Sequence, residues 1–263
     1  MKSHEPPLFW KKPPETLPDM LAYLDLPLSV GSHSDVLAKA GNDNVSHEEF
    51  LKRLLSAEVA GKFERQVQSR LRAAKLPKTR TLEGFDWKHP TFIPQAKVLE
   101  AFELRFIEKN EGLVFIAGHG LGKTHLSLAL GHRAAQAGVR TLFTTAVDMV
   151  THIAASQADH SLRQTIRLYT KPTLLIIDEL GRLSLDQKQG EYLFQVIDAR
   201  YERGSTVITT NRAFKDWGKT FHDMVCAKAI IDRLVHHSEV IKIEGTSYRL
   251  RDRKTKSLID TEE

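Results

Sequence analysis

The sequence is poor in the features that mark secreted and membrane proteins. Cys226 is the only cysteine among 263 residues, which excludes an internal disulfide and fits a reducing compartment. No apolar run approaches the roughly 18 residues that a membrane-spanning helix needs. The N-terminus, residues 1–14, contains charges and four prolines instead of the continuous apolar segment of a signal peptide. We therefore expect a cytoplasmic protein that has no membrane partner.

The composition is that of an ordinary globular protein with a modest excess of positive charge. Hydrophobic residues make up 41% and charged residues 27% of a chain that has room for one large domain or two small ones. Neither an internal repeat nor a heptad array is evident. The formal net charge of +5 suggests a polyanionic partner, and the position of the cations is more informative than their number.

The most informative stretch is a glycine-rich turn that ends in Lys123 and Thr124. It follows the apolar run 113–116 and opens onto apolar residues at helical spacing, which is the strand, turn and helix context of a P-loop. Backbone N–H groups and the positive end of the helix dipole would bind the phosphates. The residues expected to contact ATP are Gly118, His119, Gly120, Leu121, Gly122, Lys123, Thr124 and His125.

Two side chains of this turn have predicted roles of their own. Lys123 would reach the β- and γ-phosphates, and the Thr124 hydroxyl would hold Mg²⁺. Ala117 stands where the first glycine of the motif is usual, and alanine is the smallest available substitute. An ordinary turn with a chance Gly-Lys-Thr is the alternative.

A second apolar run, residues 174–177, ends in the two carboxylates Asp178 and Glu179. Phosphoryl transfer needs an anion that holds Mg²⁺ and a group that orients the attacking water. We assign the first role to Asp178 and the second, as general base, to Glu179. Capping of the next helix is the alternative, and the upstream P-loop makes it the weaker one.

Two further residues complete the predicted catalytic set. Asn211 follows the strand candidate 205–210 and could sense the γ-phosphate, although asparagine also suits a plain turn. Arg233 lies in an amphipathic segment and could stabilise the phosphoryl group bound by a neighbouring subunit. A salt bridge from Arg233 to Asp232 or another local acid is the alternative. Three histidines show no metal-ligand spacing and are interpreted as surface or packing residues: His222, His236 and His237.

A basic segment precedes this core. Ser46 and Glu49 have the spacing of a capping box, so a helix is predicted from there toward Ala74. Between residues 52 and 80, nine basic residues accompany two acidic ones. This excess favours contacts to nucleic-acid phosphates with little base reading, and a solubilising face or a contact to an acidic protein is the alternative. The candidate DNA-binding residues are Lys52, Arg53, Lys62, Arg65, Arg70, Arg72 and Lys75.

From residue 95 onward, strand candidates alternate with helix-compatible segments, which indicates an α/β fold with a mostly parallel five-stranded sheet. Ligands bind at the carboxyl ends of such strands, where the P-loop lies. The strand candidates are residues 113–116, 139–144, 174–178, 205–210 and 240–243.

The predicted organisation has five parts. They are a flexible tail (1–16), an all-α domain for DNA binding or oligomerisation (17–80), a linker (81–94), an ATPase domain (95–251) and a flexible tail (252–263). Within the all-α domain, residues 17–28 are expected to form a short helix, and residues 31–44 are polar, with a loop expected at residues 41–44.

With these motifs in place, the chain resembles the AAA+ ATPases, and among them the IstB-type transposition helpers related to the DnaC helicase loaders. The resemblance runs from about residue 17 to residue 251. Its most specific blocks are residues 50–55, 122–126, 175–181, 193–197, 200–203, 209–211, 217–218, 232–237 and 244–251.

The resemblance implies roles for particular residues. It implies Walker A at residues 117–124, Walker B at Asp178 and Glu179, sensor 1 at Asn211 and an arginine finger at Arg233. Because the chain ends soon after its last predicted strand, no C-terminal helical lid is expected. A lid-borne sensor arginine could only be approximated by one of two residues, Arg249 or Arg251.

The implied function is a Mg²⁺-dependent ATPase that assembles into homo-oligomers on duplex DNA with ATP and presents target DNA to a partner transposase. A replicative helicase loader of the DnaC type is the alternative, since the P-loop and the acidic pair serve both. The basic segment and the blocks 217–218 and 236–237 favour the transposition helper. A nucleotide switch with negligible hydrolysis is a third interpretation, against which Glu179 and Arg233 argue.

Overall fold

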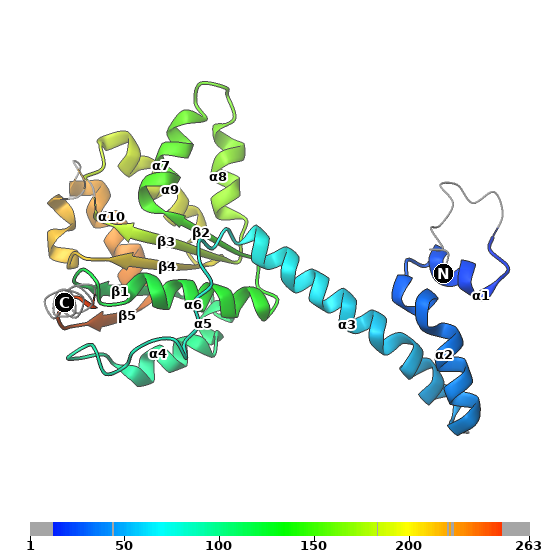
Figure 1. Cartoon of the computed structure of the whole chain (residues 1–263). Helices are drawn as coiled ribbons and strands as arrows, with labels where there is room; N and C mark the ends of the chain where they lie inside the picture. Colours follow the sequence, from blue (N-terminus) through cyan, green and yellow to red (C-terminus); the bar gives the residue numbers. More distant parts are fainter. Residues whose placement is uncertain (1–12, 44, 183, 220, 222–223, 249–263) are drawn as a thin grey trace, which may run out of the picture. The chain divides into compact units, whose positions relative to one another are not determined.

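The computed structural model of the chain describes residues 13–43, 45–182, 184–219, 221 and 224–248 (Figure 1). The chain divides into two compact units, with the boundary between Ser69 and Arg70. This boundary lies inside a helix, ahead of the predicted linker at residues 81–94. Among the described residues, no helix combines the length and the apolar character that a bilayer span requires.

The larger unit is built around a five-stranded sheet in which all neighbouring strands are parallel, in the order β2-β3-β4-β1-β5. Each strand overlaps one of the predicted strands, so the predicted sheet is confirmed. The strands are β1 (Gly112–Ala117), β2 (Thr141–Thr145), β3 (Leu174–Leu180), β4 (Ser205–Thr210) and β5 (Ser238–Ile243).

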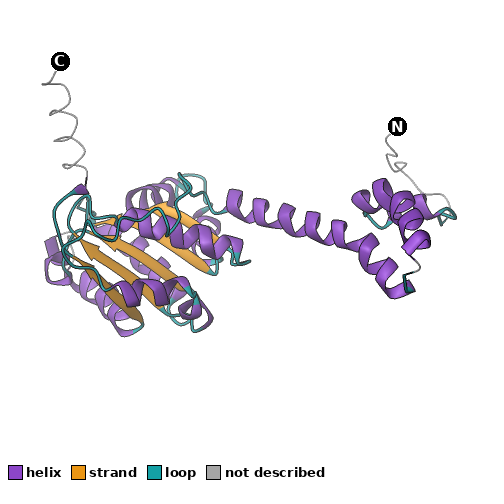
Figure 2. Cartoon of the chain, turned by 60° about the horizontal axis from the view of Figure 1, so that its bottom comes forward, coloured by secondary structure: helices purple, strands orange, loops and turns teal. Residues whose placement is uncertain are grey.

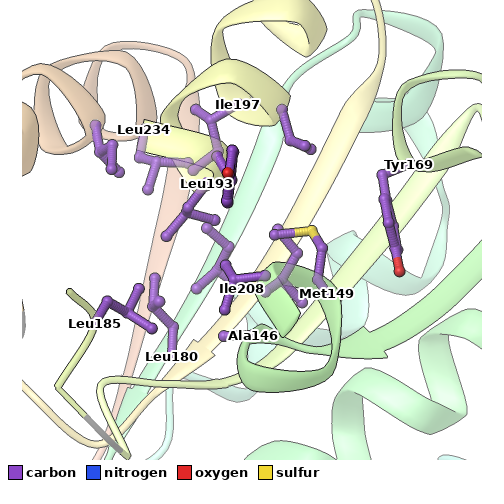
Figure 3. Packing of buried hydrophobic residues seen from close by; sticks show 14 of the residues in the cluster. Ala146, Met149, Tyr169, Leu180, Leu185, Leu193, Ile197, Ile208 and Leu234 are labelled. Carbon is purple, nitrogen blue, oxygen red and sulfur yellow. The ribbon is translucent and has the colours of Figure 1, made fainter. Parts of the chain in front are cut away.

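Helices cover both faces of this sheet (Figure 2). Successive side chains of a strand point to opposite faces, and in β3 both sets are buried. Leu174 and Ile176 join one core cluster, and Leu175 and Ile177 join the other. The second cluster also contains Met149, Leu193 and Leu234 from three helices, as Figure 3 shows. The helices are α4 (Gln95–Phe102), α5 (Arg105–Glu108), α6 (Lys123–Gln136), α7 (Ala146–Ala155), α8 (Leu162–Thr170), α9 (Gln187–Arg200), α10 (Met224–His236) and the 3₁₀ helix η1 (Phe214–Lys219).

The smaller unit contains α1 (Leu17–Tyr23), α2 (Pro27–Asp43) and most of α3 (His47–Ala73). The Ser46 hydroxyl accepts a hydrogen bond from the Glu49 N–H at 3.2 Å, which confirms half of the predicted capping box. The Glu49 carboxylate pairs with Arg53 at 3.0 Å instead of returning to the cap.

The prediction of a loop at residues 41–44 was wrong for residues 41–43, because α2 extends to Asp43. Asn44 lies outside the described residues. A glycine inside a helix, such as Gly31 in α2, weakens the helix by about 1 kcal/mol relative to alanine. The carboxylate of Glu58 in α3 offsets this cost by accepting hydrogen bonds from the N–H groups of Leu28 and Ser29, at 2.8 and 3.3 Å. N–H groups in the first turn of a helix have no partner within the helix. The partner here, Glu58, lies 30 residues from Leu28 and 29 from Ser29 in the sequence.

Candidate nucleotide site

The phosphate loop connects β1 to α6 at the carboxyl edge of the sheet. Gly120 and Gly122 have φ values of +73° and +84°, a region that glycine adopts without strain. Lys123 Nζ donates hydrogen bonds to the carbonyl oxygens of Ala117 and Gly118, at 2.9 and 2.7 Å. Ala117 is the buried last residue of β1. A strand residue needs no positive φ, so alanine fits at this position of the motif.

Two segments that are distant in the sequence pack against this loop. The ring of Phe85 contacts Gly122, where a Cβ atom would come within 2.5 Å of a ring carbon. The backbone N–H of Tyr248 donates a hydrogen bond to the carbonyl oxygen of Gly120 at 3.0 Å. The segment predicted as an irregular linker, residues 81–94, therefore forms one wall of the site, and the residues after β5 form another.

Two residues expected to contact ATP have side chains engaged elsewhere. Leu121 is 3% exposed and belongs to the core cluster beneath the loop, so only its backbone faces the phosphate position. His125 Nε2 bonds to the carbonyl oxygen of Thr81 at 2.9 Å, and its ring packs edge-on against Phe85. His125 therefore fastens the linker to the start of α6.

Asp178 lies at the end of β3, next to the first turn of α6. Thr124 Oγ1 lies 3.1 and 3.0 Å from its two carboxylate oxygens, and Thr209 Oγ1 donates to Oδ1 at 2.5 Å. Burial raises the pKa of Asp178, and the hydrogen bonds from Thr209 and Thr124 offset only part of that rise. A buried carboxyl group with a raised pKa beside a phosphate loop is typical of a functional site.

The strand β3 departs from regular geometry at Glu179. Its pairing with β4 shifts between Ile177 and Leu180, which is the pattern of a β-bulge. Glu179 has a φ of +58°, a conformation that costs a non-glycine residue about 1–3 kcal/mol. Its backbone N–H donates to Thr209 Oγ1 at 3.0 Å, and its Oε2 accepts a hydrogen bond from Arg182 Nη1 at 2.5 Å. Thr209 thus connects the two carboxylate residues.

Asn211 follows β4 directly and lies beside the phosphate loop. Its Nδ2 is 2.8 Å from Nε2 of His119. Because β4 lies between β1 and β3 in the sheet, the ends of these three strands bring the loop, Asp178 and Asn211 to one place.

The residues present fit a nucleoside triphosphate and a magnesium ion. Thr124 and Asp178 offer a hydroxyl and a carboxylate oxygen about 3.0 Å apart, which are the hard ligands that Mg²⁺ prefers. The described residues contain no group of three or more His, Cys, Asp or Glu side chains that could hold a metal ion. Magnesium in nucleotide sites takes its remaining ligands from phosphates and water, so the two protein ligands suffice.

Arg233 lies on α10, away from this cluster. Its Nε donates to Asp198 Oδ1 at 2.7 Å, and its guanidinium lies 4.7 Å from the centroid of the Phe194 ring. It lines a shallow cleft with Gly112 and Ser238, the first residues of β1 and β5. The length of a strand, about 20 Å, therefore separates Arg233 from the phosphate loop of the same chain. Its predicted role remains possible only toward another copy.

Three of the seven candidate DNA-binding residues are engaged within the protein. Arg53 pairs with Asp43 and Glu49. Arg65 pairs with Glu58. Arg70 Nε donates to the carbonyl oxygen of Ala135 near the C-terminus of α6, at 3.1 Å, where a cation stabilises the helix dipole. The other four are exposed and have no ion pair among the described residues: Lys52, Lys62, Arg72 and Lys75.

The histidines near the end of α10 contact neighbouring side chains. His236 Nδ1 lies 3.1 Å from the Tyr201 hydroxyl, and His237 Nε2 lies 3.1 Å from Glu202 Oε1. His222 lies outside the described residues, as do the two arginines considered as sensors, Arg249 and Arg251.

Sequence reasoning did not identify Thr209, Arg182, Phe85 or Tyr248 as parts of the site. Thr209 and Tyr248 lie in two of the blocks that carry the family resemblance, 209–211 and 244–251. Membership of these blocks was the signal that could have identified them as parts of the site. For Phe85 and Arg182 the sequence offered none, because their contacts depend on how remote segments fold.

A parallel sheet with a P-loop after β1, an acidic pair at the end of β3 and a polar side chain after β4 defines a P-loop ATPase fold of the AAA+ class. Residues 20–256 match the profile of the family described as "IstB-like ATP binding protein", and the chain belongs to this family.

Individual relatives agree with this assignment. An ATP-binding protein of insertion sequence IS5376 from Geobacillus stearothermophilus is 38% identical over 231 residues, covering 88% of this chain and 92% of the relative. An ATP-binding protein of insertion sequence IS21 from Pseudomonas aeruginosa is 36% identical over 219 residues, covering 83% of each chain. The crystal structure of the DnaC helicase loader has a TM-score of 0.53 at 22% identity, covering 62% of this chain and 96% of that one. This last likeness concerns the fold.

Proposed function

We propose that this protein is a Mg²⁺-dependent ATPase that assembles on target duplex DNA with ATP, recruits or activates the transposase of an insertion sequence, and hydrolyses ATP to disassemble. The observation that carries the ATPase part is the contact of Thr124 with Asp178 across the phosphate loop, at 3.0 Å. The insertion-sequence relatives supply the transposition context.

In the proposed reaction, the backbone of the phosphate loop and Lys123 bind the β- and γ-phosphates. Thr124 and Asp178 would hold a magnesium ion, which would supply positive charge next to the phosphates. Glu179 accepts a proton from the attacking water, and Asn211 orients that water. The water oxygen bonds to the γ-phosphorus while the bond to the bridging oxygen breaks, which yields ADP and phosphate.

The DNA part of the proposal rests on the cations of α3 and its C-terminal extension that form no ion pair with any other described residue. Lys52, Lys62, Arg72 and Lys75 are exposed, and cations of this kind bind phosphates without reading bases. We assign a smaller contribution to DNA binding to Arg53, Arg65 and Arg70, because DNA would have to compete with their present partners.

Self-assembly and the transposase partnership are supported by apolar surface on the smaller unit. Leu51, Leu55, Val59 and Phe63 recur every four residues on α3 and are 54%, 40%, 66% and 59% exposed. Side chains at this spacing form one ridge on a helix surface, and an exposed ridge of large apolar residues marks a protein contact. Arg233 would act on the nucleotide of a neighbouring copy in such an assembly.

The experiment that tests the proposal measures binding of duplex DNA with ATP, with ADP and without nucleotide, at two salt concentrations. We expect tight, salt-sensitive and sequence-tolerant binding that requires ATP and is lost in Lys123→Ala, whose ATP affinity is measured separately by calorimetry. Duplex binding that is negligible with every nucleotide would instead favour a loader of a replicative helicase. Retained tight ATP binding by Lys123→Ala would contradict the assignment of the phosphate loop.

A further inference from the structure

The phosphate loop contains one side chain whose presence neither the fold nor the phosphate contacts explain. Among residues 117–122 only His119 has a polar side chain, and it stands between two glycines. It is exposed, so it contributes little to the core beneath the loop. The backbone N–H groups of such a loop bind phosphate whatever side chain occupies this position. The imidazole of His119 is therefore available for another role.

The imidazole of His119 contacts the side chain of Asn211. Nδ2 of Asn211 lies 2.8 Å from Nε2 of His119, and this is the one hydrogen bond that either side chain makes among the described residues. An amide nitrogen only donates, so Nε2 accepts this hydrogen bond with its lone pair. The imidazole is then neutral, with its proton on Nδ1. The amide oxygen of Asn211, Oδ1, is left to face another group.

The backbone around Asn211 is fixed, but its amide would not be fixed without this contact. Asn211 directly follows β4, whose six residues are all buried. The Arg212 N–H donates to Thr210 Oγ1 at 3.1 Å, which holds the chain on both sides of Asn211. The last torsion of an asparagine side chain is broad and roughly twofold, so a free amide exchanges its nitrogen and its oxygen by rotation. Because His119 accepts only from the nitrogen, it selects one of the two orientations.

The selected orientation suits a group that orients the attacking water. A water molecule that attacks phosphorus directs a lone pair at it and donates its two hydrogens to acceptors. In the proposed reaction Glu179 is one acceptor, and Oδ1 of Asn211 can be the second. The opposite orientation would present the amide nitrogen, a donor that competes with the phosphorus for the lone pair of the water.

We propose that His119 is a positioning residue for ATP hydrolysis, which holds the amide of Asn211 with Oδ1 presented to the attacking water. The loop that binds the phosphates then also orients the water-facing group at the end of β4. This inference rests on the proposed function, because it requires Asn211 to orient the water. While Nε2 accepts from Asn211 it cannot donate to a phosphate oxygen, so the contact affects turnover and not the affinity for ATP.

The test compares His119→Leu with the unmodified full-length chain, because leucine keeps a side chain of similar size but offers no acceptor. We expect kcat for ATP hydrolysis at saturating ATP and Mg²⁺ to fall about two- to tenfold, the factor that corresponds to one neutral hydrogen bond. The dissociation constant of ATP, measured by calorimetry, should stay unchanged. His119→Gln keeps an acceptor oxygen and should restore most of the rate. His132→Leu, at a half-exposed histidine of α6, is the matched control and should leave kcat unchanged.

A double-mutant cycle with Asn211→Ala shows whether His119 acts through Asn211. Asn211→Ala alone should lower kcat, and His119→Leu should change kcat little in that background, because no amide is left to orient. The inference would be overturned by an unchanged kcat in His119→Leu, by weaker ATP binding as its main effect, or by losses that simply add in the double variant. An unchanged kcat in Asn211→Ala, or absence of hydrolysis by the unmodified protein, would instead contradict the proposed function.

Discussion

Thr209 joins the two acidic residues of the site, and its replacement by valine is the sharpest test of the geometry. Its hydroxyl donates to Asp178 Oδ1 at 2.5 Å and accepts from the Glu179 N–H at 3.0 Å, while the side chain is buried. A hydrogen bond to a charged group contributes about 1.5–3 kcal/mol, and an N–H left without a partner costs about 1–3 kcal/mol. The added methyl group recovers up to about 0.8 kcal/mol. We expect the free energy of unfolding to fall by about 2–4 kcal/mol.

Chemical denaturation followed by tryptophan fluorescence, to which Trp217 in the core of the larger unit contributes, measures this change. Thr141→Val is the matched control, because Thr141 is also buried and, within the described part of the chain, its hydroxyl bonds only to a backbone carbonyl, at 3.2 Å. That variant should lose about 0.5–1.5 kcal/mol. Because Thr209 also anchors the bulge at Glu179, kcat should fall about tenfold or more while ATP affinity changes little. Equal stability of the two variants, together with normal turnover in Thr209→Val, would refute this account of the site.

Three other changes test the remaining assignments. Glu179→Gln should bind ATP as tightly as the unmodified chain yet hydrolyse it at least about a hundredfold more slowly, and unchanged phosphate release would show that another residue activates the water. Asp178→Asn should raise the melting temperature of the nucleotide-free protein at pH 7–8. Burial raises the pKa of Asp178, so the stability associated with its protonated form is present at low pH and lost as the pH rises through the folded pKa. A pH series of melting curves should show that the gain in melting temperature of Asp178→Asn over the unmodified protein shrinks toward acid pH. A lower melting temperature of the variant at pH 8 would contradict the prediction. Charge reversal at Lys52, Lys62 and Arg72 should weaken duplex binding equally for all sequences and flatten its salt dependence, as measured by fluorescence anisotropy. An unaltered salt slope would remove α3 from the DNA-binding surface.

The choice of residues in the last of these variants follows from the structure. Arg65 was equally prominent in the sequence, but its guanidinium pairs with Glu58, which is 3% exposed. Reversing Arg65 would leave a buried carboxylate next to a second negative charge and would destabilise the smaller unit. The sequence could not distinguish a cation that faces solvent from one that neutralises a buried acid, because both occur in the same basic helix.

The strands and the main chemical groups could be predicted from the sequence for a specific reason. Parallel strands that are buried on both faces read as continuous apolar runs, and the run 174–177 ends directly at the carboxylates. The P-loop is a local motif, so its spacing suffices to identify it. Because the carboxyl ends of parallel strands share one edge of the sheet, the proximity of Thr124, Asp178 and Asn211 also followed from the order of elements.

What could not be predicted depends on contacts between remote segments. The helix α2 was missed because its first turn is capped by Glu58, whose side chain belongs to another helix. The linker wall of the site was missed because Phe85 meets Gly122 only once the chain has folded. In both cases local preference indicated irregular structure, and a tertiary contact determined the outcome.

Two buried carboxylates, Glu58 in the smaller unit and Asp178 in the site, differ in how well hydrogen bonds compensate for their burial. Burial alone would raise the pKa of Glu58, but hydrogen bonds from Arg65 and from two backbone N–H groups outweigh it and lower the pKa. Ionised Glu58 therefore stabilises the fold. Asp178 accepts hydrogen bonds from hydroxyl groups, which offset only part of the effect of burial, so its pKa is raised. The next residue, Glu179, adopts a strained backbone. On the proposed function, these local costs are offset when a cation and a nucleotide bind. Binding of ATP with Mg²⁺ and the stability of the larger unit are then linked.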